Sequence, residues 1–189
     1  MLKSVARLVS ILGHPGILMP FAAWLSTMDH DGADARLALP VAAFVAAAVT
    51  GYSLAKVKRG DWAHIDASGK SERHELTRLF GPGLLVAATL LFLTRLAPGV
   101  SLVMGLSGAI VMAAHGLRHR SKPSLHVAFA AFAALLAWPG AFAVVLAAFA
   151  VLVAWSRRVL ERHTRLDVVH GAILGLAAGV AFQSVASHL

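Results

Sequence analysis

The chain has 189 residues, of which 58% are hydrophobic and 14% are charged, and its net charge is +8. About a quarter of the residues of a soluble domain are usually charged, so this composition indicates a membrane protein with one domain, residues 1–189. No basic surface interleaved with aromatic residues accompanies the charge, which excludes nucleic acid and favours anionic lipids or phosphate groups as partners. The absence of cysteine excludes disulfides, thiolate metal sites and cysteine nucleophiles.

Apolar stretches long enough to cross a membrane follow one another along the chain. A helix needs roughly 20 residues to span the hydrocarbon core, and about 17 can suffice. The seven candidate spans are residues 5–26, 37–56, 80–97, 99–117, 124–138, 140–156 and 167–187. The prolines and glycines of "GHPGILMP" predict a kink or a late start in the first span.

The fifth candidate span is short, and only "WPG" separates it from the sixth. Either a tight turn at one membrane face or a re-entrant pair explains this spacing, so six or seven spans are expected. Alanine and glycine are abundant in these stretches and let helices approach closely in lipid. The sequence therefore predicts an all-α, polytopic bundle of six to seven transmembrane helices with its active site at one membrane face.

Three polar blocks interrupt the spans, at residues 56–79, 118–124 and 156–167. With seven spans, all three blocks lie on the same side as the N-terminus, and "TMDHDGADAR", "APG" and "WPG" lie on the other side. The basic side of a membrane protein is usually cytoplasmic. We therefore expect an integral protein of a bacterial inner membrane whose polar blocks face the cytoplasm.

The third block reads "SRRVLERHTRLD" and combines a histidine, a carboxylate and several arginines. His163 and Asp167 are four residues apart, which places them on one face if the segment is helical. A carboxylate on one ring nitrogen leaves the other nitrogen free as a base or nucleophile. The planar fork of Arg157 suits phosphate oxygens. The remaining arginines are predicted to be surface charges that set the topology: Arg158, Arg162 and Arg165.

The second block leads into the fifth span through "KPSLHVAF". Ser124 is placed to cap the following helix, and Lys122 adds a positive charge beside that helix N-terminus. A helix N-terminus with a cation and a hydroxyl is suited to an anion. His126 is expected one turn into the membrane, where an ionisable side chain is costly and indicates function.

These two blocks together resemble the type 2 phosphatidic acid phosphatase superfamily. The family's third motif, S-R, five residues, H, three residues, D, is matched in full by Ser156-Arg157, His163 and Asp167. Its second motif, P-S-G-H, is matched by the segment 123–126, in which Leu125 replaces the glycine. The resemblance covers roughly residues 56–180 and extends to "DVVHGAILG", where Gly171 and Gly175 are expected to allow close packing.

The family's first motif, K, six residues, R-P, has no counterpart in this chain. In its place, "HIDASGKSERHEL" looks like the D-x-x-x-[RK]-x-x-R pattern of a divergent membrane branch. That match implies roles for Asp66, Lys70 and Arg73, with Lys58 a weaker candidate. The N-terminal "HPGILMP" looks like the start of the same branch, and we assign its histidine, His14, to packing.

The resemblance implies a lipid phosphatase without a metal or other cofactor. His163 would attack phosphorus to form a phosphohistidine, Asp167 would orient it, and His126 would protonate the leaving oxygen and then activate water. The phosphate would be held by Arg157 and Ser124 together with Arg73, Lys70 or Lys122. Phosphatidic acid, phosphatidylglycerophosphate and polyprenyl pyrophosphate are the candidate substrates. The alternatives are a polytopic membrane transporter and a non-enzymatic protein that binds anionic lipid; the oligomeric state is left open.

Overall fold

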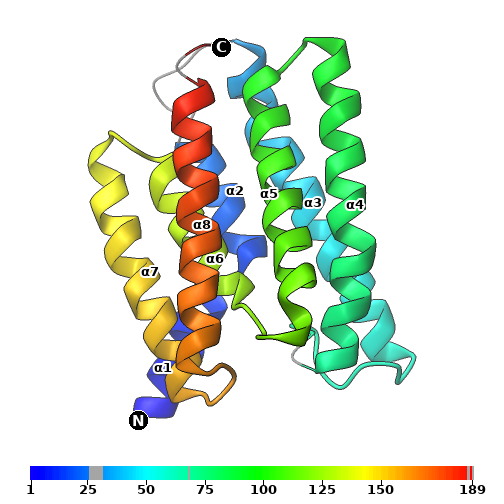
Figure 1. Cartoon of the computed structure of the whole chain (residues 1–189), viewed down its shortest axis with the longest axis vertical. Helices are drawn as coiled ribbons and strands as arrows, with labels where there is room; N and C mark the ends of the chain where they lie inside the picture. Colours follow the sequence, from blue (N-terminus) through cyan, green and yellow to red (C-terminus); the bar gives the residue numbers. More distant parts are fainter. Residues whose placement is uncertain (26–31, 68, 187, 189) are drawn as a thin grey trace.

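The computed structural model describes residues 1–25, 32–67, 69–186 and 188, and these residues form an all-helical bundle (Figure 1). The predicted all-α class is therefore confirmed. The helices are α1 (Leu2–Leu12), α2 (Pro15–Leu25), α3 (Ala33–Lys58), α4 (Lys70–Thr94), α5 (Pro98–Gly116), the short 3-10 helix η1 (Leu117–His119), α6 (Leu125–Leu136), α7 (Ala141–Val159) and α8 (Arg165–Ala186).

Helices α3, α4, α5 extended by η1, α7 and α8 are each long and apolar enough to cross a membrane. Helices α1 and α2 meet at an angle of 54° and pass the same test as one broken span. The bend lies at His14 and Pro15, as "GHPGILMP" predicted, because proline lacks the N–H that would continue a helix. Five spans, or six with the bent pair, indicate an integral membrane protein.

The predicted span 124–138 is helical over only part of its length, so at most six helices or helix pairs of the described residues meet the length expected of a span. Its helical part is α6, which has 12 residues and is about 18 Å long, well short of the roughly 30 Å hydrocarbon core. The residues just before it, 121–124, form an extended segment with no regular structure.

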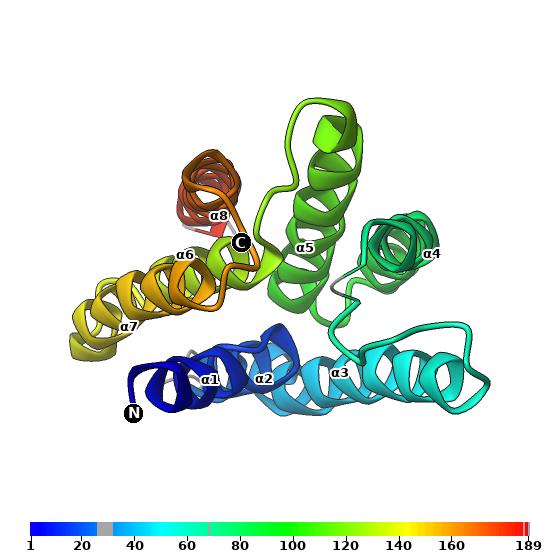
Figure 2. The same ribbon diagram turned by 90° about the horizontal axis from the view of Figure 1, so that it is seen from below.

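Helix α6 is the centre of the bundle. Ten of its 12 residues are buried, and it packs against α2, α5, α7 and α8. Figure 2 shows the row formed by α1, α2 and α3 on one side of it and α8 on the other. A short helix that is apolar all round belongs to a core rather than to a lipid-facing surface.

Three glycines of α8, spaced four residues apart, bring α6 and α8 into close contact. A Cβ atom on Gly171 would meet the backbone of Ser124, one on Gly175 would meet the carbonyl of Ala128, and one on Gly179 would meet the side chain of Leu135. Small residues at this spacing let two helices approach closely in a membrane. The contact fixes the N-terminus of α6 beside the first turn of α8, and it confirms the packing expected of Gly171 and Gly175.

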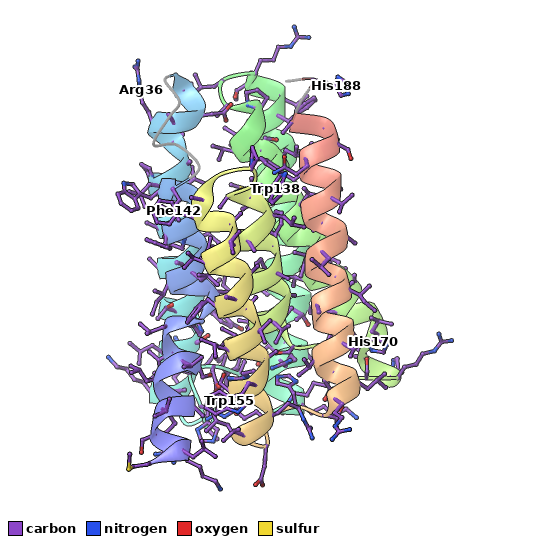
Figure 3. The ribbon with its side chains drawn as sticks, turned by 90° about the vertical axis from the view of Figure 1, so that its left-hand side faces the viewer. Arg36, Trp138, Phe142, Trp155, His170 and His188 are labelled. Atoms are coloured by element: carbon purple, nitrogen blue, oxygen red, sulfur yellow. The ribbon has the colours of Figure 1, made fainter. Side chains whose placement is uncertain are left out.

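The loops that carry the three polar blocks lie at the same end of the bundle as the N-terminus, the lower end in Figure 1. Figure 3 places His170 toward this end and Arg36 and His188 at the opposite end. The predicted grouping of the polar blocks is therefore confirmed. Asp29, His30 and Asp31, which belong to the loop expected on the other side, lie outside the described residues.

Candidate functional site

The chain reverses direction sharply after α7, and this turn positions His163. The N–H of Arg162 donates to the carbonyl of Arg157 at 3.1 Å, and the N–H of Glu161 donates to that of Arg158 at 3.0 Å. Glu161 takes the left-handed conformation, with φ of 57°, which is the usual backbone of this helix stop. His163 therefore lies in the turn between α7 and α8, so the helical arrangement under which the spacing would place it on one face with Asp167 does not apply.

Asp167 holds the start of α8 and the adjacent extended segment. One carboxylate oxygen, Oδ2, accepts the N–H of Thr164 at 2.8 Å, and the N–H of Asp167 donates to Thr164 Oγ1 at 3.2 Å, which is a reciprocal capping box. The other oxygen, Oδ1, accepts the N–H of Lys122 at 2.7 Å. Asp167 is therefore fixed by three hydrogen bonds that do not involve the His163 ring.

The ring of His163 is oriented mainly by a backbone carbonyl. Its Nδ1 donates to the carbonyl oxygen of Lys122 at 3.1 Å, whereas Asp167 Oδ2 is 3.8 Å away. Because a carbonyl can only accept, the proton belongs on Nδ1 and the lone pair on Nε2. The predicted His–Asp pair is present as a charge contact, whereas the hydrogen bond of the His163 ring goes to the Lys122 carbonyl.

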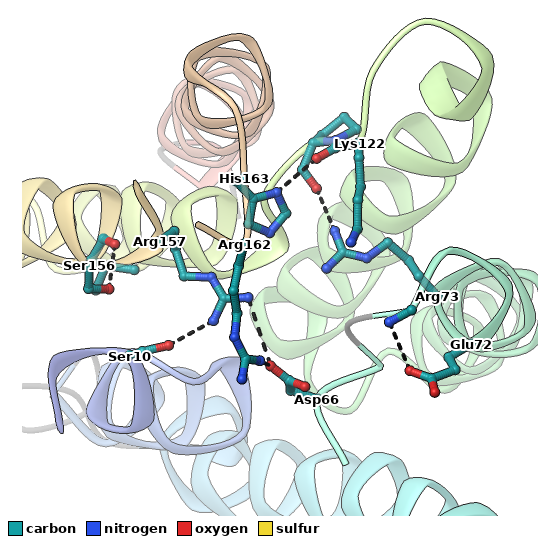
Figure 4. A network of polar contacts seen from close by, with 12 residues as sticks. Ser10, Asp66, Glu72, Arg73, Lys122, Ser156, Arg157, Arg162 and His163 are labelled. Carbon is teal, nitrogen blue, oxygen red and sulfur yellow. Dashed lines mark hydrogen bonds and ion pairs between the residues drawn. The ribbon is translucent and has the colours of Figure 1, made fainter. Parts of the chain in front are cut away.

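The extended segment before α6 is buried, and site residues satisfy its backbone (Figure 4). Arg73 Nη1 donates to the carbonyl of Pro123 at 3.0 Å, and the N–H of Ser124 donates to the carbonyl of Asp167 at 2.9 Å. Irregular backbone at membrane depth is tolerated where protein groups pair it in this way. Ser124 is the N-cap residue of α6, but its hydroxyl makes no capping bond, contrary to the prediction.

Arg157 lies at the centre of the site with 1% of its surface exposed. Its Nη1 donates to Ser10 Oγ of α1 at 2.7 Å. Its Nη2 is 3.9 Å from Asp66 Oδ2, a charge contact too long for a hydrogen bond. One terminal nitrogen of the guanidinium is thus held by Ser10, and the other faces the carboxylate of Asp66.

Within the described part of the chain, four buried side-chain atoms have no hydrogen-bond partner. They are Ser124 Oγ, Arg157 Nε, Arg157 Nη2 and His163 Nε2. Buried polar atoms are nearly always paired, since leaving one unpaired costs about 1–3 kcal/mol. Unpaired donors from Arg157 and Ser124 beside an unpaired imidazole nitrogen are the arrangement expected of a site built for an anion.

Asp66 is an acidic residue among the cations of this site. It forms ion pairs with Arg162 and Arg157. Glu72 fixes the loop that carries it, because its carboxylate accepts the N–H of Ala63 at 2.7 Å and that of Gly69 at 2.8 Å. Figure 4 shows Arg162 reaching back to Asp66 past Arg157.

Two arginines predicted to be surface charges therefore serve the site. Arg162 pairs with Asp66 because the turn at Glu161 directs its side chain inward. Arg158 donates to the carbonyl of His163 at 2.6 Å and so supports the same turn. Arg165 is exposed at the start of α8, as predicted.

Four cationic side chains thus meet two carboxylates at the lower end of the bundle (Figure 4). The cations are Arg73, Lys122, Arg157 and Arg162, and the carboxylates are Asp66 and Asp167. Burial, followed by the positive charge of Arg73, lowers the pKa of Lys122 from its usual value. The excess of positive charge suits an anion with two charges.

Two cavities open on the site. An elongated cavity of about 690 Å³ is lined at its polar end by His14, Asp66, Arg73 and His126. A smaller one of about 250 Å³ is lined by His163 and Asp167 together with Arg158, Glu161, Arg162 and Thr164. Asp66 lines the first cavity and Arg162 lines the second, so their ion pair stands between the two.

The structure brings together the residues predicted for the site except Lys70 and the weaker candidate Lys58, which is exposed at the last position of α3 and lines neither cavity. Lys70 is exposed at the first position of α4 and lines neither cavity. Ser10 was missed, and nothing in its local sequence marks it. His14, which was assigned to packing, lies in the cavity with its ring centre 5.1 Å from that of His126. The sequence feature that could have indicated a role for His14 at the site is its position in "HPGILMP".

His163 is expected to remain uncharged at every pH from 5 to 8. Burial first, and then the charges of Arg73, Arg157 and Lys122, lower the pKa of His163 to about 3, against the opposing effect of Asp167. An imidazole with a lowered pKa loses its proton at lower pH than usual, so it is already the free base at pH 5. Nitrogen NMR of histidine-labelled protein should show an unprotonated Nε2 throughout. In the isolated peptide 156–167, the same ring should titrate near pH 6.5. If His163 titrated at the same pH in the protein and in the peptide, its burial beside the three cations would be contradicted.

Among the described residues, no group of three His, Asp or Glu side chains is placed to hold a metal ion. The site contains guanidinium, ammonium and hydroxyl groups. The chain matches no protein-family model, no curated protein and no solved structure.

Proposed function

We propose that this protein is a membrane-bound phosphatase that hydrolyses the phosphate ester or pyrophosphate of a lipid through a phosphohistidine, in the manner of the type 2 phosphatidic acid phosphatase superfamily. One observation carries the proposal. The Nε2 of His163 is buried and unpartnered in the same site as the unpartnered donors of Arg157 and Ser124. A nucleophile and donors for phosphate oxygens are the two components that this reaction needs.

In the first step, the lone pair of His163 Nε2 forms a bond to phosphorus as the bond from phosphorus to the leaving oxygen breaks. The proton on Nδ1 stays hydrogen-bonded to the Lys122 carbonyl, so the ring becomes an N-phosphorylated imidazolium. Asp167 Oδ2, at 3.8 Å from Nδ1, stabilises that positive charge. His126 gives a proton to the leaving oxygen of the lipid alcohol or lipid phosphate.

In the second step, His126 takes a proton from water, and the resulting hydroxide attacks phosphorus. The bond from phosphorus to His163 breaks, and its electron pair returns to Nε2 as inorganic phosphate is released. In both steps charge gathers on the three equatorial oxygens, which Arg157, Arg73 and Ser124 are placed to bind. His14 lies against the His126 ring, and its Nδ1 is fixed because it accepts the N–H of Gly16 at 3.1 Å.

A lipid substrate follows from the surroundings of the site. The polar end of the large cavity lies beside Arg73 and His126, and most of the remaining lining is apolar. A head group bound there keeps its hydrocarbon portion among the helices, which a water-soluble phosphate ester would not require. Phosphatidic acid, phosphatidylglycerophosphate and polyprenyl pyrophosphate remain the candidates, and the basic end is proposed to face the cytoplasm.

The purified protein should release inorganic phosphate from at least one of these lipids in the presence of a metal chelator. Replacing His126 with alanine should lower kcat by about 10²- to 10⁴-fold, because it removes both proton transfers. His119→Ala is the matched control, since His119 is an exposed histidine at the same end of the bundle. No release from any lipid in the panel, or equal rates for the two variants, would overturn the proposed function.

A further inference from the structure

The elongated cavity extends far beyond the chemical groups of the site. Its polar end holds His126 and Arg73, whereas its other end is lined by Asp34, Gly99, Trp138 and Gln183. Figure 3 shows Trp138 toward the end of the bundle opposite to the polar loops. The cavity therefore runs along most of the length of the bundle.

One wall of the cavity is built from small side chains of α3. The residues of α3 in the middle of the lining are Ala38, Val41, Ala42, Val45, Ala46 and Val49. Their spacing of three or four residues places them on one helical face. Alanine and valine do not fill the distance between α3 and the helices behind it, so the sequence of α3 itself creates the space.

Helix α3 is attached to the bundle mainly at its two ends. At the upper end, the carboxylate of Asp34 accepts the N–H groups of Gly99 and Val100 at 3.2 and 2.8 Å, which caps α5. At the lower end, Glu75 of α4 accepts the hydroxyl of Tyr52 at 2.7 Å and pairs with Lys56 at 2.8 Å. Of the 26 residues of α3, Ser53 alone is buried. The middle of α3 is thus a side wall between the cavity and the surrounding lipid.

The length of the cavity distinguishes between kinds of hydrocarbon chain. Lining residues on α3 run from Asp34 to Val49, which is about 22 Å of helix. One leaflet of a bilayer is half of the hydrocarbon core, or about 15 Å. A chain that fills this cavity from the polar end therefore passes the middle of the membrane, which the chains of a two-chain phospholipid in one leaflet do not do.

We propose that the cavity binds a single hydrocarbon chain longer than one leaflet, so that the substrate is a long-chain polyprenyl phosphate or pyrophosphate. This inference rests on the proposed function, because Arg73 and the neighbouring cations supply the charge that would hold the phosphate end. The apolar lining and the basic end match the two parts of such a lipid.

Filling the far half of the cavity should shorten the chain that is accepted. We expect Ala38→Trp to lower kcat/KM for undecaprenyl phosphate by at least about tenfold and to leave the rate with farnesyl phosphate within about twofold of wild type. Ala43→Trp is the matched control, because Ala43 is an exposed α3 residue outside the lining and should change neither rate. Equal losses with both lipids, or no loss with the long one, would overturn the proposal.

A labelling experiment on the unaltered protein tests the same inference without catalysis. A long-chain polyprenyl phosphate with a photoreactive diazirine at its tail end should label the far-end residues Met104, Trp138 and Phe182, as mapped by mass spectrometry. Excess unlabelled undecaprenyl phosphate should suppress that labelling. Labelling confined to outward-facing side chains would overturn the proposal. If no lipid releases phosphate but the far end is still labelled, the proposed catalysis fails and the chain-binding site stands.

Discussion

Replacing His163 with alanine is expected to abolish phosphate release, with a loss of at least about 10³-fold in kcat. The neutral ring offers an unpartnered Nε2, and Arg157 and Ser124 of the same site also carry unpartnered buried atoms. Alanine removes the imidazole nitrogen that is proposed to form the covalent bond to phosphorus. The neighbouring cations would remain, so affinity for the lipid should fall much less than kcat.

The covalent intermediate gives a second measurement. A radiolabelled substrate mixed with the wild-type enzyme and quenched in alkali should leave phosphate on His163, and the His163→Ala variant should carry none. His170→Ala is the control, because His170 lies at the same end and its ring nitrogen contacts Ser121 Oγ at 2.7 Å, outside the anion-binding atoms. Phosphate release or labelling that survives in His163→Ala would exclude His163 as the nucleophile.

Replacing Gly175 with leucine is expected to destabilise the whole bundle. A Cβ atom at this position would overlap the carbonyl oxygen of Ala128 and lie 2.9 Å from the Cβ of Ala131, and backbone cannot move aside cheaply. Overpacking of this kind costs about 1–3 kcal/mol or more. That loss corresponds to a fall of roughly 2–12 °C in the unfolding temperature of a chain of this size. Thermal unfolding in detergent measures it.

Gly83→Leu provides the matched control for this substitution. Gly83 lies inside α4, and a Cβ atom there would meet nothing within 4 Å. The two variants add the same side chain to a helical glycine, so a difference in unfolding temperature reports the contact of α6 with α8. Equal stability of both variants would contradict that contact.

The order and spacing of the polar residues predicted much of the site. His163, Asp167, Arg157, Lys122 and Ser124 meet because two loops at one end of the bundle converge on α6. The spacing alone could not predict the bonds among them. The spacing would place His163 and Asp167 on one face only in a helix, and Glu161 in the left-handed conformation ends α7 before His163. The hydrogen bond to its ring comes from a backbone carbonyl, a group that no sequence pattern specifies.

The unpredicted residues come from distant parts of the chain. Ser10 reaches Arg157 across 147 positions, and this contact depends on how α1 packs against α7. Arg73 was predicted from the divergent first motif and lies at the site, whereas Lys70 of the same motif is exposed at the first position of α4. The short length of α6 also escaped prediction, since apolar composition does not reveal that the residues before it are extended.

The carboxylate of Asp66 gives this site an internal counter-ion. Its contacts with Arg157 and Arg162 already neutralise part of the positive charge that a phosphate would use. Under the proposed function, an arriving phosphate exchanges for Asp66 instead of adding to an uncompensated cluster of cations. The net affinity for phosphate is then the difference between the interactions that the arginines make with the phosphate and those that they make with Asp66. A doubly charged phosphate can win that exchange, whereas chloride and other singly charged ions compete poorly.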